Sequence, residues 1–80
     1  STGSYWVSLV IESSSRGGIF HDIATIFDAM RIPLADVRSQ EREDGTWLHR
    51  LLLKISSYEQ LEHVLGKLEL APHVTRSYLA

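Results

Sequence analysis

Apolar and polar residues alternate at the start of the chain, as they do in a strand with one buried face. Tyr5, Val7, Leu9 and Ile11 share one face, and the residues between them share the other. The serine- and glycine-rich residues 13–18 then favour a turn, because serines can cap a helix and glycines adopt positive φ. The pattern therefore predicts a strand from residue 5 that leads into a helix.

The spacing of apolar residues changes after this turn. They recur at intervals of three and four residues, which is typical of one helix face, and they are Ile19, Ile23, Ile26, Phe27 and Met30. The helix should end before Pro33, because the residue before a proline avoids the helical region. A more polar segment from about Leu34 to Arg42 then predicts a strand at a sheet edge.

The second half of the chain repeats this order. Asp44-Gly45 predicts a hairpin, and alternation returns over residues 46–55, so a third strand is expected there. A second helix should follow, capped by Ser56 or Ser57. Its apolar stripe consists of Tyr58, Leu61, Val64, Leu65 and Leu68. After Pro72, residues 73–79 are expected to form the last strand.

The order βαββαβ predicts an α+β, ferredoxin-like sandwich, in which two helices cover one face of an antiparallel four-stranded sheet. Residues 1–4 are small, polar and lack an initiator methionine. We expect them to be a cloning remnant or a linker from a longer protein. Residues 5–80 should form a single domain.

The composition of the chain excludes several classes of function and site. The 80 residues carry a net charge of −2, which argues against a domain that mainly neutralises DNA or RNA phosphates. The chain contains no cysteine, so it has neither disulfides nor thiolate metal sites, and a cytoplasmic location is expected. The longest apolar run, Leu51-Leu52-Leu53, is far shorter than the roughly 20 residues of a membrane span.

Candidate catalytic and metal sites are weak. The histidines never show the i, i+4 spacing of a helical metal site, so we expect solvated or partly buried imidazoles; they are His21, His49, His63 and His73. An acylphosphatase-like enzyme is conceivable, because Arg16 lies in the first loop, where backbone N–H groups could cradle a phosphate. Such an enzyme would need an asparagine to position the attacking water, and the chain has none. Glu41, Glu43 and Asp44 are expected to form a solvated hairpin tip. We therefore expect no catalytic residue, no metal site and no cofactor.

The face of the sheet that the helices leave open is the more informative surface. Alternation places Trp6, Val10, Leu48 and Leu52 there, beside charged side chains. An apolar patch of this kind on a small domain favours a protein–protein interface, although a tolerated amphipathic face is the alternative. An RNA-binding face built on Trp6, Trp47 and His49 is disfavoured, because the third strand lacks the basic-glycine-aromatic pattern of the RNA-recognition motif and the chain is acidic overall.

Several segments resemble an ACT domain. They are Tyr5–Ile11, then Ser15-Arg16-Gly17-Gly18-Ile19 with Asp22-Ile23-Ala24, then Arg31–Leu34, Asp44–Thr46, Leu61–Leu68 and Pro72–Val74. The resemblance spans about residues 5–79. The run Leu65-Gly66-Lys67-Leu68, with Pro72, Val74 and Arg76, is most similar to the C-terminal ACT domain of the RelA/SpoT (p)ppGpp synthetase/hydrolase family.

The resemblance implies a non-catalytic regulatory module, here of a GTP pyrophosphokinase of the stringent response, that forms a homodimer and contacts other domains of its parent enzyme or, through that parent, the ribosome. It also implies a small effector, such as a branched-chain amino acid, bound between the first loop of one copy and the start of the second strand in its neighbour. Arg16, Gly18 and Ile19 match the family pattern there. The residues expected to bind the effector are Arg16, Gly17, Gly18, Ile19, Ile32 and Leu34.

This sequence departs from the family pattern at three places: Ser15 replaces Asp, Gly17 replaces Pro, and Pro33 stands where Asn is common. Two alternatives stay open. The glycines can serve the turn alone, leaving an interaction domain with no small ligand that docks on a partner protein or the ribosome. The parent can also be an enzyme of amino-acid metabolism.

Overall fold

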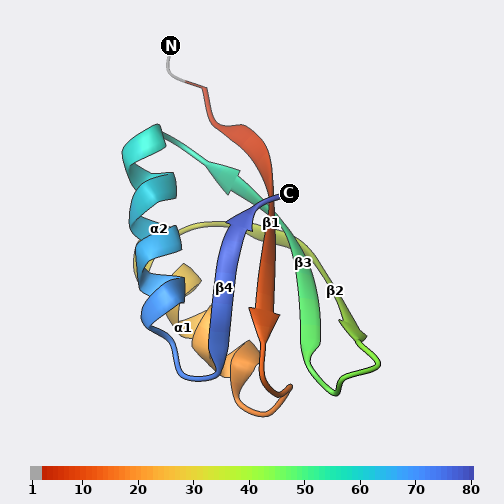
Figure 1. Ribbon diagram of the computed structural model, residues 1–80. Coiled ribbons are helices and arrows are strands. Elements are labelled where there is room, and N and C mark those ends of the chain that lie inside the picture. Colours follow the sequence, from red (N-terminus) through yellow and green to blue (C-terminus); the bar gives the residue numbers. More distant parts are fainter. Residues whose placement is uncertain (1–2) are drawn as a thin grey trace.

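The computed structural model describes residues 3–80 and contains four strands and two helices within them. The elements are β1 (Tyr5–Ser13), α1 (Ile19–Met30), β2 (Leu34–Glu41), β3 (Trp47–Ile55), α2 (Tyr58–Leu70) and β4 (Val74–Leu79). The strands form one antiparallel sheet in the order β2-β3-β1-β4. Both helices lie against the same face of this sheet (Figure 1).

The predicted ferredoxin-like βαββαβ fold is therefore confirmed, and the polar strand β2 lies at an edge of the sheet as expected. Of the expected linker, residues 1–4, the first two lie outside the described residues.

The core lies between the sheet and the helices. β1 and β3 pair along their whole lengths, from Tyr5 opposite Ile55 to Ser13 opposite Trp47. Because side chains alternate across a strand, the odd-numbered residues of both strands face the helices. The core side chains are 5 % exposed or less, and they are Leu9, Ile11, Ile19, Ile23, Phe27, Ile32, Leu51, Leu53, Ile55, Leu61, Val64 and Leu68.

The two helices begin in different ways. The backbone N–H of Gln60 donates to the Ser57 side chain at 3.1 Å, so the predicted serine cap of α2 is confirmed. The serines before α1 do not cap it, because Gly18 occupies the N-cap with a φ of 77° and no side chain accepts a hydrogen bond there. Glycine suits this position because the left-handed region has no steric cost without a Cβ.

The prediction that Tyr58 belongs to the apolar stripe of α2 is wrong. Its side chain is 63 % exposed, and its hydroxyl donates to Glu62 Oε2 at 3.3 Å. Tyr58 is the first residue of α2 and lies one turn before Leu61, the first buried residue of that helix. A phenol at a helix end can keep its hydroxyl in water, whereas an aliphatic side chain has no such option.

Substitutions of two neighbouring leucines in β3 test which face of the sheet is buried. Leu53 is fully buried and Leu52 is 36 % exposed. We expect Leu53→Ala to lower the free energy of unfolding by about 2–5 kcal/mol, because it leaves a cavity in the core. Leu52→Ala should lower it by less than about 1 kcal/mol. Urea unfolding at 25 °C measures both, and equal losses would contradict the assignment of faces.

Candidate functional site

The loop between β1 and α1 leaves the start of the helix without a side-chain cap. The backbone N–H of Ile19 donates to the Arg16 carbonyl of this loop at 3.4 Å. The first N–H groups of any helix have no partner within it, and no side chain caps α1. Gly17 and Gly18 are both exposed, and a Cβ at either would meet no atom within 4 Å. The end of the helix therefore faces open space with its positive dipole end outward.

Arg16 lies beside this helix end and is held by two aromatic rings. Its guanidinium carbon is 5.3 Å from the centroid of the Phe20 ring and 5.7 Å from that of Trp47. Phe20 comes from the first turn of α1, whereas Trp47 is the first residue of β3. Cation–π contacts of this length are favourable and orient the guanidinium. A charged donor and an uncapped helix N-terminus thus meet at one loop, and both attract an anion.

His49 lies beneath this arrangement with none of its side chain exposed. Ser13 Oγ donates to the Ser15 carbonyl at 2.8 Å, so it accepts from His49 Nε2–H, which lies 2.9 Å away. Nδ1 then carries no proton and accepts from Ser39 Oγ at 2.7 Å. This bonding, assigned from the network, joins the ends of three strands through one neutral imidazole.

The same ring also supports the aromatic residues around Arg16. Its centroid is 5.5 Å from that of Phe20 in an edge-to-face arrangement, and 6.3 Å from that of Trp47 in a stacked one. Burial, and secondarily the charge of Arg16, lower the pKa of His49 below its ordinary value of 6.5. The expectation that every histidine is solvated or partly buried is therefore wrong for His49.

The six residues expected to hold a ligand do not meet in one chain. Arg16, Gly17 and Gly18 lie at the start of α1, whereas Ile32 and Leu34 follow its end. The 12 residues of α1 separate the two groups by about 18 Å, given a rise of about 1.5 Å per residue. The side chains of Ile19 and Ile32 are at most 5 % exposed and belong to the core, while Leu34 is 37 % exposed.

The residues expected at an interface differ in exposure. Trp6 is 54 % exposed and Leu52 36 %, and Leu48 is half-buried. Val10 is only 2 % exposed, so the expectation that it offers contact area on the open face is wrong. It pairs with Arg50 on one side and Tyr78 on the other, and such large neighbours enclose a valine side chain.

The acidic hairpin tip has a local structural role. Thr46 donates to Asp44 Oδ1 through its hydroxyl at 2.6 Å and its backbone N–H at 2.9 Å. These bonds lower the pKa of the Asp44 carboxyl from its ordinary value, so it remains ionised and accepts bonds within the turn. Residues 3–80 hold no cluster of three or more side chains suited to a metal ion.

Sequence reasoning missed the aromatic platform of Arg16 and the hydrogen bonds of His49. A signal for the second was present, because alternation places Ser13, Ser39 and His49 on the helix-facing side of three strands. Polar residues at core-facing positions need partners, and here they bond to one another.

Among the described residues, neither helix is long and apolar enough to cross a membrane.

Comparison with known proteins gives a family and a set of similar folds. The family model described as ACT domain matches residues 1–77. The ACT domain from the GTP pyrophosphokinase of Chlorobium tepidum superposes with a TM-score of 0.80 at 13 % identity, covering 98 % of this chain and 100 % of that one. The C-terminal domain of the MgtC protein from Mycobacterium tuberculosis superposes with a TM-score of 0.80 at 15 % identity, covering 100 % and 89 %.

A third similar structure belongs to a much longer chain. The homoserine dehydrogenase of Thiobacillus denitrificans superposes with a TM-score of 0.79 at 16 % identity, covering 98 % of this chain but 17 % of that one. No curated protein matches the sequence. At identities this low, the three superpositions show a shared fold alone.

His49 makes stability depend on pH. In the unfolded chain its imidazole binds a proton near pH 6.5, whereas the folded chain binds it only at lower pH. Its full contribution is therefore present above pH 6.5, and the free energy of unfolding falls as the pH drops below that value. We expect this part of the pH dependence to vanish in His49→Gln. Urea unfolding of both proteins between pH 7.5 and pH 5 measures it, and parallel curves would contradict the buried neutral imidazole.

The two glycines of the loop form a matched pair. Gly18 has a positive φ and Gly17 does not, although both have open space around them. We expect Gly18→Ala to lower the free energy of unfolding by about 1–2 kcal/mol, because alanine is disfavoured in the left-handed region. Gly17→Ala should leave it nearly unchanged. Thermal or urea unfolding separates the two, and an equal effect would show that strain at Gly18 is not the cause.

Proposed function

The chain belongs to the ACT domain family, and from that premise we propose that it regulates a GTP pyrophosphokinase of the RelA/SpoT type by pairing and by binding an apolar amino acid. ACT domains are regulatory rather than catalytic. The proposed parent is supported by the leucine-rich second helix and by the fold shared with the Chlorobium tepidum domain. An enzyme of amino-acid metabolism is the alternative parent, and the fold shared with homoserine dehydrogenase supports it.

One observation carries the proposed ligand. Arg16 is held between Phe20 and Trp47 at the uncapped start of α1. A guanidinium and a helix N-terminus without a side-chain cap together suit a carboxylate, because each supplies donors and positive charge. The α-carboxylate of an amino acid would lie there, with the backbone at Gly17 and Gly18 leaving it room.

The apolar end of the ligand requires a second copy of the chain. Leu34 is exposed but lies beyond the far end of α1, so it cannot reach a ligand at Arg16 in the same chain. In a homodimer, the Leu34 region of one copy would meet the loop of the other and cover a branched-chain side chain. Amino-acid binding would then favour the paired arrangement through its higher affinity for that state.

The regulated parent is proposed to be cytoplasmic.

A second candidate function is docking without a small ligand. The exposure of Trp6 and Leu52 on the open face favours it, because apolar side chains gathered on a small domain often mark an interface. The occupant could be another domain of the parent, a partner protein or the ribosome.

Calorimetry with valine, leucine and isoleucine tests the proposed ligand. We expect binding heat, and a rise in the dimer fraction in sedimentation when the amino acid is added. Arg16→Gln should weaken binding by about tenfold or more, since it removes a hydrogen bond between charged groups. Lys67→Gln, which removes a charge from exposed α2, serves as the matched control. The absence of heat with all three amino acids would reject the ligand and leave docking as the function.

A further inference from the structure

The open face of the sheet, opposite the helices, carries an excess of positive charge on a chain whose net charge is −2. The register places Arg38, Arg50, Lys54 and Arg76 on this face, against Glu12 and Asp36. The helices instead carry mostly carboxylates, which are Asp22, Asp28, Glu59, Glu62 and Glu69. The two sides of the domain thus differ in sign, and the open face complements an acidic surface.

Arg38 and Arg50 are direct cross-strand partners in the β2–β3 pair. Like charges at such positions destabilise a sheet, so this pair works against the β2–β3 pairing. Arg38 bonds to Asp36 at 2.9 Å, but both side chains are more than half exposed. Among the residues that the structure describes, no carboxylate lies within salt-bridge distance of Arg50. An unpaired charge therefore stands near the centre of the open face.

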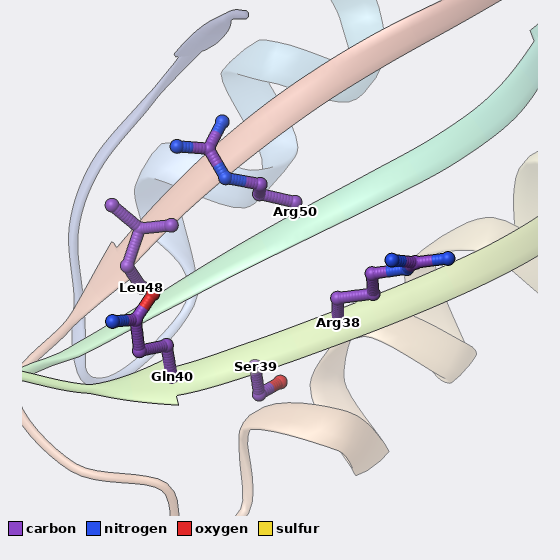
Figure 2. A pocket seen from close by; sticks show the side chains of 5 residues that line it. All are labelled: Arg38, Ser39, Gln40, Leu48 and Arg50. Atoms are coloured by element: carbon purple, nitrogen blue, oxygen red, sulfur yellow. The ribbon is translucent and has the colours of Figure 1, made fainter.

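A hollow lies on each side of this arginine pair, and each measures about 270 Å³. Leu48 and Gln40 line the first, and Leu52 and Ser8 line the second. Figure 2 shows Leu48, Gln40, Arg38 and Arg50 on the open side of the sheet, with Ser39 on the side of α1. Along β3 the open face is therefore apolar at Leu48, basic at Arg50 and apolar again at Leu52.

This spacing is close to that of an α-helix. Alternate residues of a strand are about 6.6–6.8 Å apart, and four residues of a helix rise about 6 Å. A helix laid along β3 with acidic residues at positions i+3 and i+4 brings them to Arg50 and Arg38, whose strands are about 4.8 Å apart. Apolar residues at i and i+7, which rise about 10.5 Å along the helix, then extend their side chains toward the hollows beside Leu48 and Leu52, whose Cα atoms are about 13 Å apart.

We propose that the open face binds an acidic amphipathic helix of a partner protein, with Arg38 and Arg50 selecting for its carboxylates. This inference rests on the second candidate function, docking, and specifies the partner's chemistry. Single-stranded RNA fits less well, because bases need free aromatic faces to stack on. Lys54 Nζ already lies 5.3 Å from the Trp6 ring centroid, and the Arg76 guanidinium carbon 4.2 Å from that of Tyr78. Among the described residues that line the two hollows, the apolar ones are aliphatic and none is aromatic.

The test uses two synthetic helical peptides of fourteen residues in an alanine–glutamine background. The first has leucines at its fourth and eleventh positions and glutamates at its seventh and eighth. The second has glutamines in place of these glutamates. Nuclear magnetic resonance titration of the ¹⁵N-labelled chain measures affinity and locates the contact. We expect the acidic peptide to shift the amides of β2 and β3 around Arg38, Leu48 and Leu52, and to bind about tenfold or more tightly than the neutral peptide.

Arg50→Gln should bind both peptides equally and weakly, whereas Lys67→Gln should behave like the original chain. Arg50→Gln is not expected to unfold the domain, because it removes a like-charge contact, and its urea midpoint should be unchanged or higher. If both peptides bind the original chain equally, docking stands but its acidic chemistry is overturned. If neither binds, or if shifts fall on the helices, docking at this face is overturned as well. If a single-stranded oligouridine binds this face more tightly than the acidic peptide, the proposed helical partner is overturned in favour of RNA.

Discussion

The antiparallel pairing of β1 with β3 is the contact on which the other features of this domain depend. These two strands are the central ones of the sheet, and their register runs without a break from Tyr5 opposite Ile55 to Ser13 opposite Trp47. That register decides which side chains face the helices and which face the opposite side. It therefore sets both the apolar core and the charge pattern of the open face, because a shift of one residue would exchange the two.

His49 connects this register to the loop at the start of α1. Its imidazole bonds Ser13 at the end of β1 and Ser39 on β2, while its ring contacts Phe20 and Trp47. The same two rings hold the guanidinium of Arg16. A buried polar network that is fully bonded is rigid, so Arg16 is positioned jointly by β3, through Trp47, and by the first turn of α1, through Phe20.

The order of the elements, the edge position of β2 and the cap of α2 at Ser57 could all be predicted from the sequence. They depend on periodicity and on short turn motifs, which act over a few residues. Only part of the candidate site could be predicted from the sequence. Arg16 and Gly18 were identified by resemblance, and the helical spacing already placed Ile19 on the core face. Ile32 follows the end of that helix, and no periodic pattern could show that its side chain is buried in the core.

The sequence by itself thus determined the fold class, the two faces of each strand and the family to which the chain belongs. Only the tertiary structure decided that Val10 is enclosed, that Tyr58 is exposed and that Arg38 stands opposite Arg50. The first and the third depend on neighbours that are distant in the chain and meet through strand register. Tyr58 is exposed because it is the first residue of α2, one turn before the first buried residue of that helix. Local patterns assign a side chain to a face, whereas its burial and its charge partners are set by what the sheet places beside it.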